Sequence, residues 1–219
     1  MKITKYLHSC LLLEHENERL LFDPGSFSFA NGEVNAAELP DIDYLVITHD
    51  HPDHLYGPAI RTIIASHQPE IIGNQEVADR LQRDAIEVTV FDEGKRQFGA
   101  FQLEALPVAH QPILSEKVPT VTAFLINGTI LNPGDSFSDD LLRFKGCELL
   151  FCPIMAPFLK EVEAFEFMKR MEPKAVFAVH DGYAKPYFVE ARQKNYRAYL
   201  EELGIGFHGL VEMGESITI

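Results

Sequence analysis

Four side chains that can bind a metal ion lie within six consecutive positions of this sequence. His49, His51, Asp53 and His54 follow the apolar residues 44–48 directly, with the spacing His-x-His-x-Asp-His. Imidazole and carboxylate together suit zinc, manganese or iron(II), and suit calcium or magnesium poorly. A buried strand that ends in such a cluster places its donor atoms at the rim of a sheet, where a ligand can reach them. The segment therefore predicts a metal site.

Three later predicted strands also end in a His or an Asp that is followed by a loop. The residues at these strand ends are His110, Asp135 and His180. Because ligand sites form at the carboxyl ends of strands in open sheets, we expect these residues to join the first cluster. The seven side chains are enough for two metal ions with three protein ligands each and one shared carboxylate.

The elements that must position these residues alternate along the chain. Strands are predicted at 4–14, 19–22, 44–48, 69–73, 86–91, 98–108, 121–126, 129–131, 148–152, 175–179 and 216–219. Helices are predicted at 54–66, 75–83, 138–144, 160–171 and 186–203, with residues 26–40 as a loop. Asn127-Gly128 favours a type I′ hairpin turn, Ser138 an N-cap, and Gly204 a C-cap. Both halves supply strands and helices, which predicts one domain with two sheets packed face to face and helices outside.

Composition excludes several classes of protein. Of the 219 residues, 46% are hydrophobic, so a real core can form, and no apolar stretch reaches 18 residues, so no membrane span is expected. The N-terminus does not resemble a signal peptide. The net charge of −14 repels phosphate backbones, so we expect no nucleic-acid partner. Cys10, Cys147 and Cys152 form no pairable set, and we expect them to be buried thiols of a cytoplasmic protein.

The whole chain resembles the metallo-β-lactamase-fold hydrolase superfamily. The seven candidate ligands occur in the order of that family, and residues 6–14 and 21–25 resemble its opening hairpin. Among the branches, this short chain is similar to the ascorbate-6-phosphate lactonase-like group of metal-dependent hydrolases. The resemblance implies an α/β (α+β) fold, a four-layer αββα sandwich of two mixed sheets flanked by helices, with the metals at one edge.

The resemblance also implies which residue does what. It assigns His49, His51 and His110 to a first ion, Asp53, His54 and His180 to a second, and Asp135 to both. Two divalent ions, zinc by preference and manganese or iron as alternatives, lower the pKa of a shared water from about 15.7 toward neutrality. We expect Asp53, Asp135 and His180 to be catalytic, with Asp135 holding the resulting hydroxide and Asp53 orienting it.

Departures from other branches narrow the function. β-Lactamases of this fold commonly carry Cys where Asp135 stands, flavodiiron relatives carry Glu where His51 stands, and nuclease and glyoxalase II relatives are longer. We therefore expect hydrolysis of a small-molecule ester or lactone. Phosphodiester cleavage, or metal binding without turnover, remain as alternatives, although an intact set of seven ligands favours an enzyme.

Residues beyond the ligand set are less well defined by the sequence. His8, Asp181 and Tyr183 are candidates to line the site and to protonate the leaving group, and Asp50 is a candidate to orient a ligand imidazole. Phe158, Phe165 and Phe167 flank the predicted helix 160–171. We expect these three to pack in the core or at a contact between copies in a homo-oligomer, rather than in a substrate pocket.

Overall fold

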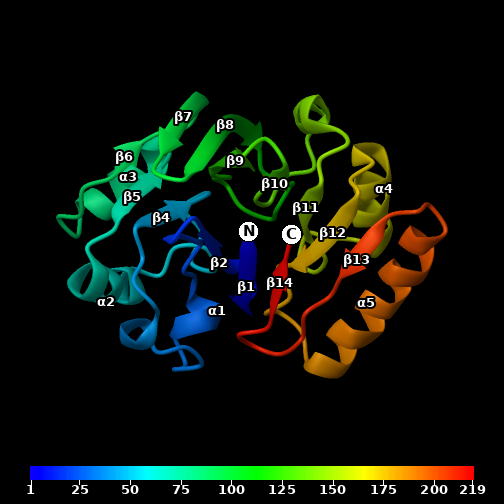
Figure 1. Cartoon of the computed structure of the whole chain (residues 1–219), viewed down its shortest axis with the longest axis horizontal. Coiled ribbons are helices and arrows are strands. Elements are labelled where there is room, and N and C mark those ends of the chain that lie inside the picture. The colour runs from blue at the N-terminus through cyan, green and yellow to red at the C-terminus, as the bar shows by residue number, and fades with distance from the viewer.

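The computed structural model describes residues 1–219 as two seven-stranded sheets (Figure 1). In the first sheet the order is β14 (Ser216–Thr218), β1 (Lys2–Leu7), β2 (Cys10–His15), β3 (Glu18–Phe22), β4 (Tyr44–Ile47), β5 (Glu70–Gly73) and β6 (Thr89–Val90). In the second it is β13 (Gly206–His208), β12 (Ala175–Val179), β11 (Leu149–Pro153), β10 (Ile130–Asn132), β9 (Thr120–Ile126), β8 (Phe101–Ala109) and β7 (Gly94–Phe98).

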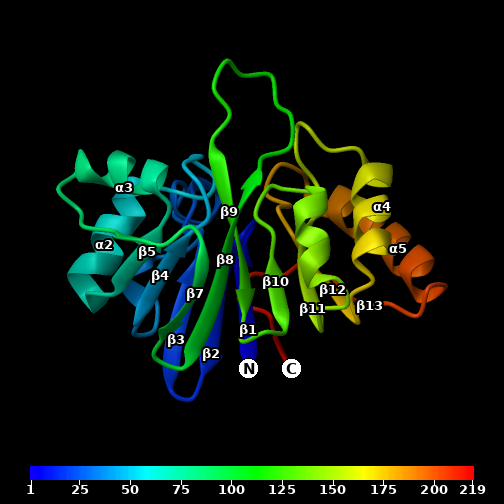
Figure 2. The same ribbon diagram turned by 90° about the horizontal axis from the view of Figure 1, so that it is seen from above.

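Helices cover the outer face of each sheet. The first sheet carries α1 (Ser26–Phe29), the 3₁₀ turn η1 (Ala36–Glu38), α2 (Gly57–His67) and α3 (Gln75–Gln82); the second carries the 3₁₀ turn η2 (Asp139–Phe144), α4 (Glu161–Met171) and α5 (Pro186–Glu201). Figures 1 and 2 show α2 and α3 on one side of the molecule and α4 and α5 on the other, with the sheets between them. The predicted four-layer αββα sandwich is confirmed.

Strand β2 shows why continuous apolar runs suit this architecture. Leu11 and Leu13 point into the core between the two sheets, whereas Cys10 and Leu12 point into the core beneath α2 and α3. Successive side chains of a strand face opposite sides, so a strand covered on both faces needs apolar residues at every position. Each fully buried leucine contributes roughly 1.5–3 kcal/mol to folding.

The strand directions bring the candidate ligands to one edge. Strands β3, β4 and β5 run parallel, as do β10, β11, β12 and β13. Strand β8 is antiparallel to β9 and β9 to β10, so β8 runs the same way as β10. The carboxyl ends of β8, β10 and β12 therefore share an edge, and the loop 110–119 projects beyond it, at the top of Figure 2.

The N-terminal segment differs from the prediction in a way that matters for the site. Residues 4–14 are not one strand, because the chain reverses at His8-Ser9 to form the antiparallel pair β1 and β2. His8 takes a left-handed conformation, with φ of 61°. The turn was missed because it contains no Gly, Asn or Pro, the residues that usually mark one.

Other predicted boundaries were partly wrong. The helix predicted from residue 54 begins at Gly57, the predicted loop 26–40 contains α1 and η1, and the predicted strand 86–91 shrinks to β6, while β7 and β13 were not predicted. Helix α5 ends at Glu201, before Gly204. The Asn127-Gly128 turn is confirmed by φ values of 49° and 69°, and Ser138 caps η2 by accepting from the Asp140 amide.

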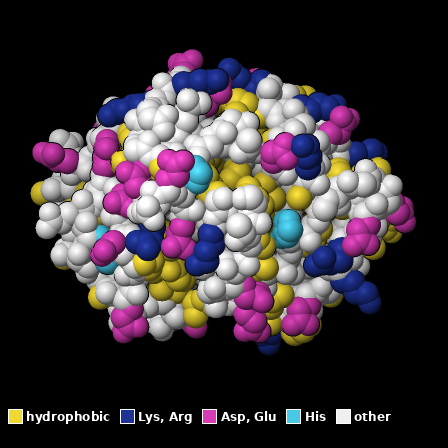
Figure 3. Space-filling view, in the orientation of Figure 1, with side chains coloured by type: hydrophobic (Ala, Val, Ile, Leu, Met, Phe, Trp, Pro, Cys, Tyr) yellow, Lys and Arg dark blue, Asp and Glu magenta, His cyan; other side chains and the backbone are white.

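The three cysteines are buried thiols, as the sequence predicts. Cys10, Cys147 and Cys152 are free and buried. None of the helices is both long and apolar enough to cross a bilayer. On the face shown in Figure 3, acidic and basic side chains are interspersed, and no extended basic surface is present there.

Candidate metal centre

Two groups of four metal-binding side chains lie at the carboxyl edge of the sheets. One contains His49, His51, His110 and Asp135; the other contains His8, Asp53, His54 and His180. Within each group one ligand atom per residue lies within 4.8 Å of every other. Each group combines residues that follow strands of the first sheet with residues that follow strands of the second. The structure thus brings together all seven sequence-predicted ligands and adds His8 as an eighth neighbour.

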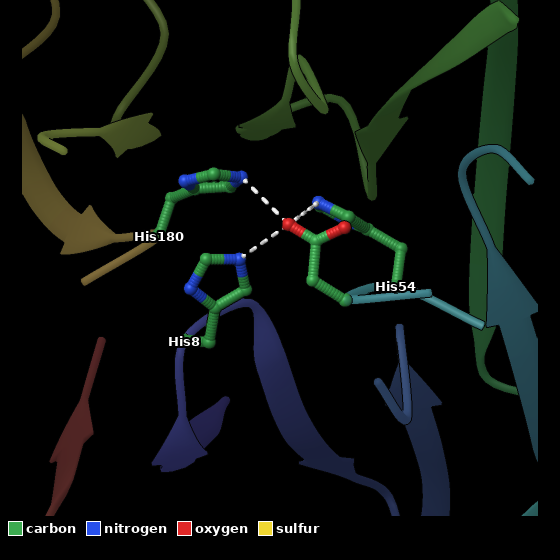
Figure 4. Close-up of side chains that lie close together, drawn as sticks. His8, His54 and His180 are labelled. Atoms are coloured by element: carbon green, nitrogen blue, oxygen red, sulfur yellow. Dashed lines mark hydrogen bonds and ion pairs between the residues drawn. The ribbon is translucent and has the colours of Figure 1, made fainter. Parts of the chain in front are cut away.

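The carboxylate of Asp53 is at the centre of the second group. Its Oδ2 lies 3.1 Å from His8 Nε2, 3.5 Å from His180 Nε2 and 3.9 Å from His54 Nε2. Figure 4 shows the three imidazoles pointing toward one carboxylate from different segments of the chain. Asp53 and His54 follow β4, His8 lies in the β1–β2 turn, and His180 follows β12.

Asp135 lies between the two groups. Its Oδ2 is 3.6 Å from His110 Nε2 and 3.9 Å from His49 Nε2 in the first group, and 3.0 Å from His180 Nε2 in the second. Its Oδ1 is 3.5 Å from His54 Nε2, also in the second. One carboxylate within reach of both groups is the arrangement that a shared ligand requires.

Hydrogen bonds behind the site fix the orientation of the ligand rings. Asp23, which is 1% exposed, accepts from His54 Nδ1–H at 2.9 Å, from the Thr48 hydroxyl at 2.9 Å and from the Thr48 amide at 2.8 Å. Because the Thr48 hydroxyl donates to Asp23, its oxygen accepts from His49 Nδ1–H, at 2.9 Å. Protons on both Nδ1 atoms leave the Nε2 lone pairs of His49 and His54 facing the site.

Backbone carbonyls do the same for the ligands of the second sheet. His110 Nδ1–H donates to the Gln111 carbonyl at 2.5 Å, and His180 Nδ1–H donates to the Met155 carbonyl at 2.6 Å. The Nε2 atoms of His54, His110 and His180 and the Oδ1 atom of Asp135 are buried without any hydrogen-bond partner. Buried polar atoms left unpaired cost about 1–3 kcal/mol each, and a cation between them removes that cost. The donor set and its orientation therefore fit a bound metal.

The protons of the metal-free site support the same conclusion. Burial opposes protonation of His54 and His180, but the carboxylates around each ring together outweigh it. Asp135 and Asp23 raise the pKa of His54 well above its ordinary value, and Asp135 and Asp53 raise that of His180 to about 9. Burial also opposes ionisation of Asp135, yet His180 and His54 lower the pKa of its carboxyl well below the usual range. In the metal-free protein, protons on His54 and His180 thus neutralise the carboxylates that a bound cation would neutralise.

His8 is a hydrogen-bond donor here rather than a free ligand. The Gly182 amide donates to His8 Nδ1 at 3.0 Å, so the ring proton lies on Nε2 and points to Asp53 Oδ2. Burial, together with His180, lowers the pKa of His8 to about 3, so the ring is neutral. This position is consistent with the expectation that His8 lines the site, and the hydrogen-bond partner of its Nε2–H is Asp53.

Tight backbone packing holds these loops. A Cβ on Gly25 would lie 1.6 Å from the carbonyl oxygen of Asp53, so only glycine allows the Asp-Pro-Gly turn to pack on the ligand loop. His180, like His8, has a left-handed backbone, with φ of 64°, and its amide donates to the His8 carbonyl at 3.0 Å. Such conformations cost about 1–3 kcal/mol and cluster at functional sites.

The remaining candidates lie in different surroundings. The Tyr183 hydroxyl donates to Asp53 Oδ2 at 3.0 Å, and the side chain is 48% exposed. Burial, together with Asp53, raises the pKa of Tyr183. Asp181 pairs instead with the buried ammonium of Lys5. Asp50 is half-buried and belongs to neither group.

The structure narrows the expectation about the aromatic residues. Phe158 is half-buried and belongs to none of the hydrophobic clusters, so it is not a core residue, and a contact between copies stays a prediction. Its ring lies 5.3 Å from the ring of His110 and 6.0 Å from that of His180. Phe167 is buried in the core as expected, and Phe165 packs beside Tyr199. Asp23 was missed as well, although it follows the apolar strand β3 as the other site residues follow theirs.

Comparison with known proteins agrees with the geometry. The model of the family described as "Beta-lactamase superfamily domain" matches residues 2–180. Protein Rv0786c of Mycobacterium tuberculosis is 25% identical over 194 residues, covering 85% of this chain and 86% of that protein. A UPF0173 metal-dependent hydrolase of Carboxydothermus hydrogenoformans is 29% identical over 196 residues, covering 82% and 84%.

A solved structure shows the same fold. Igni18, described as a novel metallo hydrolase from the archaeon Ignicoccus hospitalis, matches with a TM-score of 0.77 at 20% identity, covering 100% of this chain and 97% of that one. The lactonase-like group suggested by the sequence stays a prediction. The family match spans most of the chain and includes all the candidate ligands, so this chain belongs to the beta-lactamase superfamily.

Proposed function

We propose that this chain is a hydrolase that uses two divalent cations to cleave a small-molecule ester or lactone. The observation that carries the proposal is the convergence of buried Nε2 atoms from both sheets on Asp135, with the opposite ring nitrogens already bonded. Several imidazoles that face one buried carboxylate with the same nitrogen are the arrangement that metal ligation requires. The names of the metal-dependent relatives agree with this function.

The two groups divide the ligands between the cations. His49, His51 and His110 would hold one, Asp53, His54 and His180 the other, and Asp135 both. Zinc is the first choice because imidazole and carboxylate suit it, and manganese and iron suit the same set. When bound, the cations lower the pKa of water and polarise the substrate oxygen.

The protein supplies orientation and a proton. Asp23 and the two backbone carbonyls keep the Nε2 lone pairs directed inward, so the ligand set needs no rearrangement. In the hydrolysis, the oxygen of one water bonds to the acyl carbon and the acyl–oxygen bond breaks. One proton of that water ends on the leaving oxygen, and the other leaves to solvent when the product acid ionises. We propose the half-exposed Tyr183 hydroxyl as the group that passes a proton to the leaving oxygen and regains one from solvent.

Metal analysis and a substrate panel test the proposal together. We expect two metal ions per chain, and turnover of esters and lactones that is lost with a chelator and restored by zinc, manganese or iron. Faster turnover of bis(4-nitrophenyl) phosphate than of any ester would favour a phosphodiesterase. Two bound ions with no turnover of esters, thioesters, lactones or phosphodiesters would favour a non-catalytic metal protein.

The setting of the protein is proposed from its thiols. Three free, buried cysteines fit a reducing compartment, so we propose that it works in the cytoplasm on a small molecule. Self-association into a homo-oligomer stays a prediction that sedimentation can test.

A further inference from the structure

Three aromatic side chains stand beside the metal-binding groups without belonging to any core. Phe27 on α1, Phe158 before α4 and Tyr183 before α5 are all partly exposed, and none is a member of the three hydrophobic clusters. The exposed part of an aromatic ring adds nothing to folding. Rings gathered around a polar site are typical of ligand pockets, which are apolar with a few convergent polar groups.

Their contacts place them at both groups. Phe158 packs on one ligand ring from each group, at 5.3 Å from His110 and 6.0 Å from His180. The ring of Tyr183 stacks on that of His180 at 5.6 Å, and Phe27 packs on Tyr183 at 4.8 Å. If the reacting bond of a substrate lies between the two groups, the part of the substrate that extends out of the site therefore contacts these aromatic rings.

Most of the positive charge near this edge is already engaged. The Lys5 ammonium is buried and bonded to Asp181 and to the carbonyls of Ala178 and Leu210. On the surrounding loops, Lys117 and Lys160 are exposed and lie 3.7 Å and 3.0 Å from Glu76 and Glu163 respectively. Lys185, at the start of α5, is exposed, and the net charge of the chain is −14. A charged group of the substrate that lies away from the reacting bond and out of reach of Lys185 would lose water without gaining a partner.

We propose that the substrate carries an uncharged aromatic acyl group, which packs between Phe158 and the Tyr183–Phe27 pair while its ester or lactone carbonyl faces the metals. This rests on the proposed hydrolase function and refines it. It departs from what the resemblance to the ascorbate-6-phosphate lactonase-like group implies, because a phosphorylated sugar lactone carries an anionic group away from its reacting bond, whereas the buried cation Lys5 is already bonded to Asp181.

Three esters with one leaving group test the acyl preference of the metal-loaded protein. They are 4-nitrophenyl 3-phenylpropanoate, 4-nitrophenyl hexanoate and the 4-nitrophenyl monoester of adipic acid, which matches hexanoate in length and adds a carboxylate. We expect kcat/KM to fall in that order, with the anionic ester at least about tenfold below hexanoate. Equal or faster cleavage of the anionic ester would overturn the proposal.

Matched variants connect the preference to the aromatic residues. Phe158→Ala should raise KM for the phenylpropanoate ester roughly two- to tenfold and reduce its advantage over hexanoate. Phe165→Ala removes the same side chain from α4, where the ring packs on Tyr199, and should leave both esters unaffected. If Phe158→Ala changes both esters equally, the ring does not contact the acyl group. Lys185 lies at the start of α5, and loss of any anionic activity in Lys185→Ala would show that a cation reaches the site.

A binding measurement tests the aromatic pocket separately from the proposed hydrolase function. Saturation-transfer NMR with 4-phenylbutan-2-one, a neutral ketone that cannot be hydrolysed, reports contact of the phenyl ring. Transfer that Phe158→Ala abolishes supports the aromatic pocket even if no ester is turned over, in which case only the hydrolase proposal fails. Ester turnover without phenyl preference or ring saturation leaves the hydrolase and rejects the pocket.

Discussion

Replacing Asp23 by Asn tests how the site keeps its ligands ready. The carboxylate accepts three hydrogen bonds, two from Thr48 and one from His54, and it is 1% exposed. An amide has one accepting oxygen and one NH₂ group. If the NH₂ replaces Oδ2, His54 must accept it at Nδ1, and its proton moves to Nε2, where the metal should bind. If the NH₂ replaces Oδ1, it faces the Thr48 amide N–H, so two donors meet without an acceptor.

Both outcomes have a measurable size. Loss of a partner that orients a metal ligand typically costs 10–100-fold in affinity, or about 1.4–2.7 kcal/mol. A buried, unpaired donor costs about 1–3 kcal/mol of folding free energy. We therefore expect Asp23→Asn to weaken one of the two zinc ions by about 10–100-fold, and to lower the stability of the metal-free protein by about 1–3 kcal/mol.

Competition with a chromophoric zinc chelator measures the two affinities, and urea unfolding of the metal-free protein measures the stability. Asp43→Asn is the matched control, because that exposed carboxylate also accepts a backbone N–H, from Arg19 at 2.8 Å, but lies outside the site. If Asp23→Asn leaves both zinc affinities within twofold of the wild type and the stability of the metal-free protein unchanged, neither orientation of the amide has the expected effect and the reasoning is wrong.

Three further changes follow from the second group. His8→Gln keeps a hydrogen-bond donor toward Asp53 and should retain two metal ions per chain. His8→Phe removes that donor and should bind the second ion roughly tenfold more weakly. If metal analysis finds equal loss in both variants, His8 is itself a ligand. His180→Ala should leave about one ion per chain, and two ions would remove His180 from the ligand set. The raised pKa of His180, about 9, stabilises the metal-free protein below pH 6.5, and that stability should be lost as the pH rises from about 6.5 to 9. Thermal unfolding over a series of pH values measures this loss. The zinc-loaded protein should not show it, because the cation replaces the proton.

The sequence predicted which residues gather at the site, because their positions follow from strand direction. His110, Asp135 and His180 come directly after apolar runs that the structure confirms as strands, or within three residues of them. Parallel strands put their carboxyl ends on one edge, so residues far apart in sequence meet there. The order of the ligands resembles one family, and the division into two groups that the resemblance implies agrees with the two groups that the distances form.

Residues placed by loops could not be predicted in the same way. The turn at His8 could not be predicted from the local sequence, because hydrogen bonds to distant residues stabilise it. These bonds join His8 to Gly182, Asp53 and the His180 amide. Phe158 looked like a core residue because a ring near an amphipathic helix usually is one. Only the path of the loop before α4 turns it toward His110.

Each ligand group draws side chains from both sheets, and this has a consequence beyond chemistry. A cation in either group joins the two halves of the sandwich across their shared edge, so removing it weakens the packing of one half on the other. At a hundredfold excess over its dissociation constant, an ion that binds only the folded chain adds about 2.7 kcal/mol to its stability. In a metal-starved cell the protein would therefore become scarce as well as idle, because the unfilled chain opens and is degraded sooner.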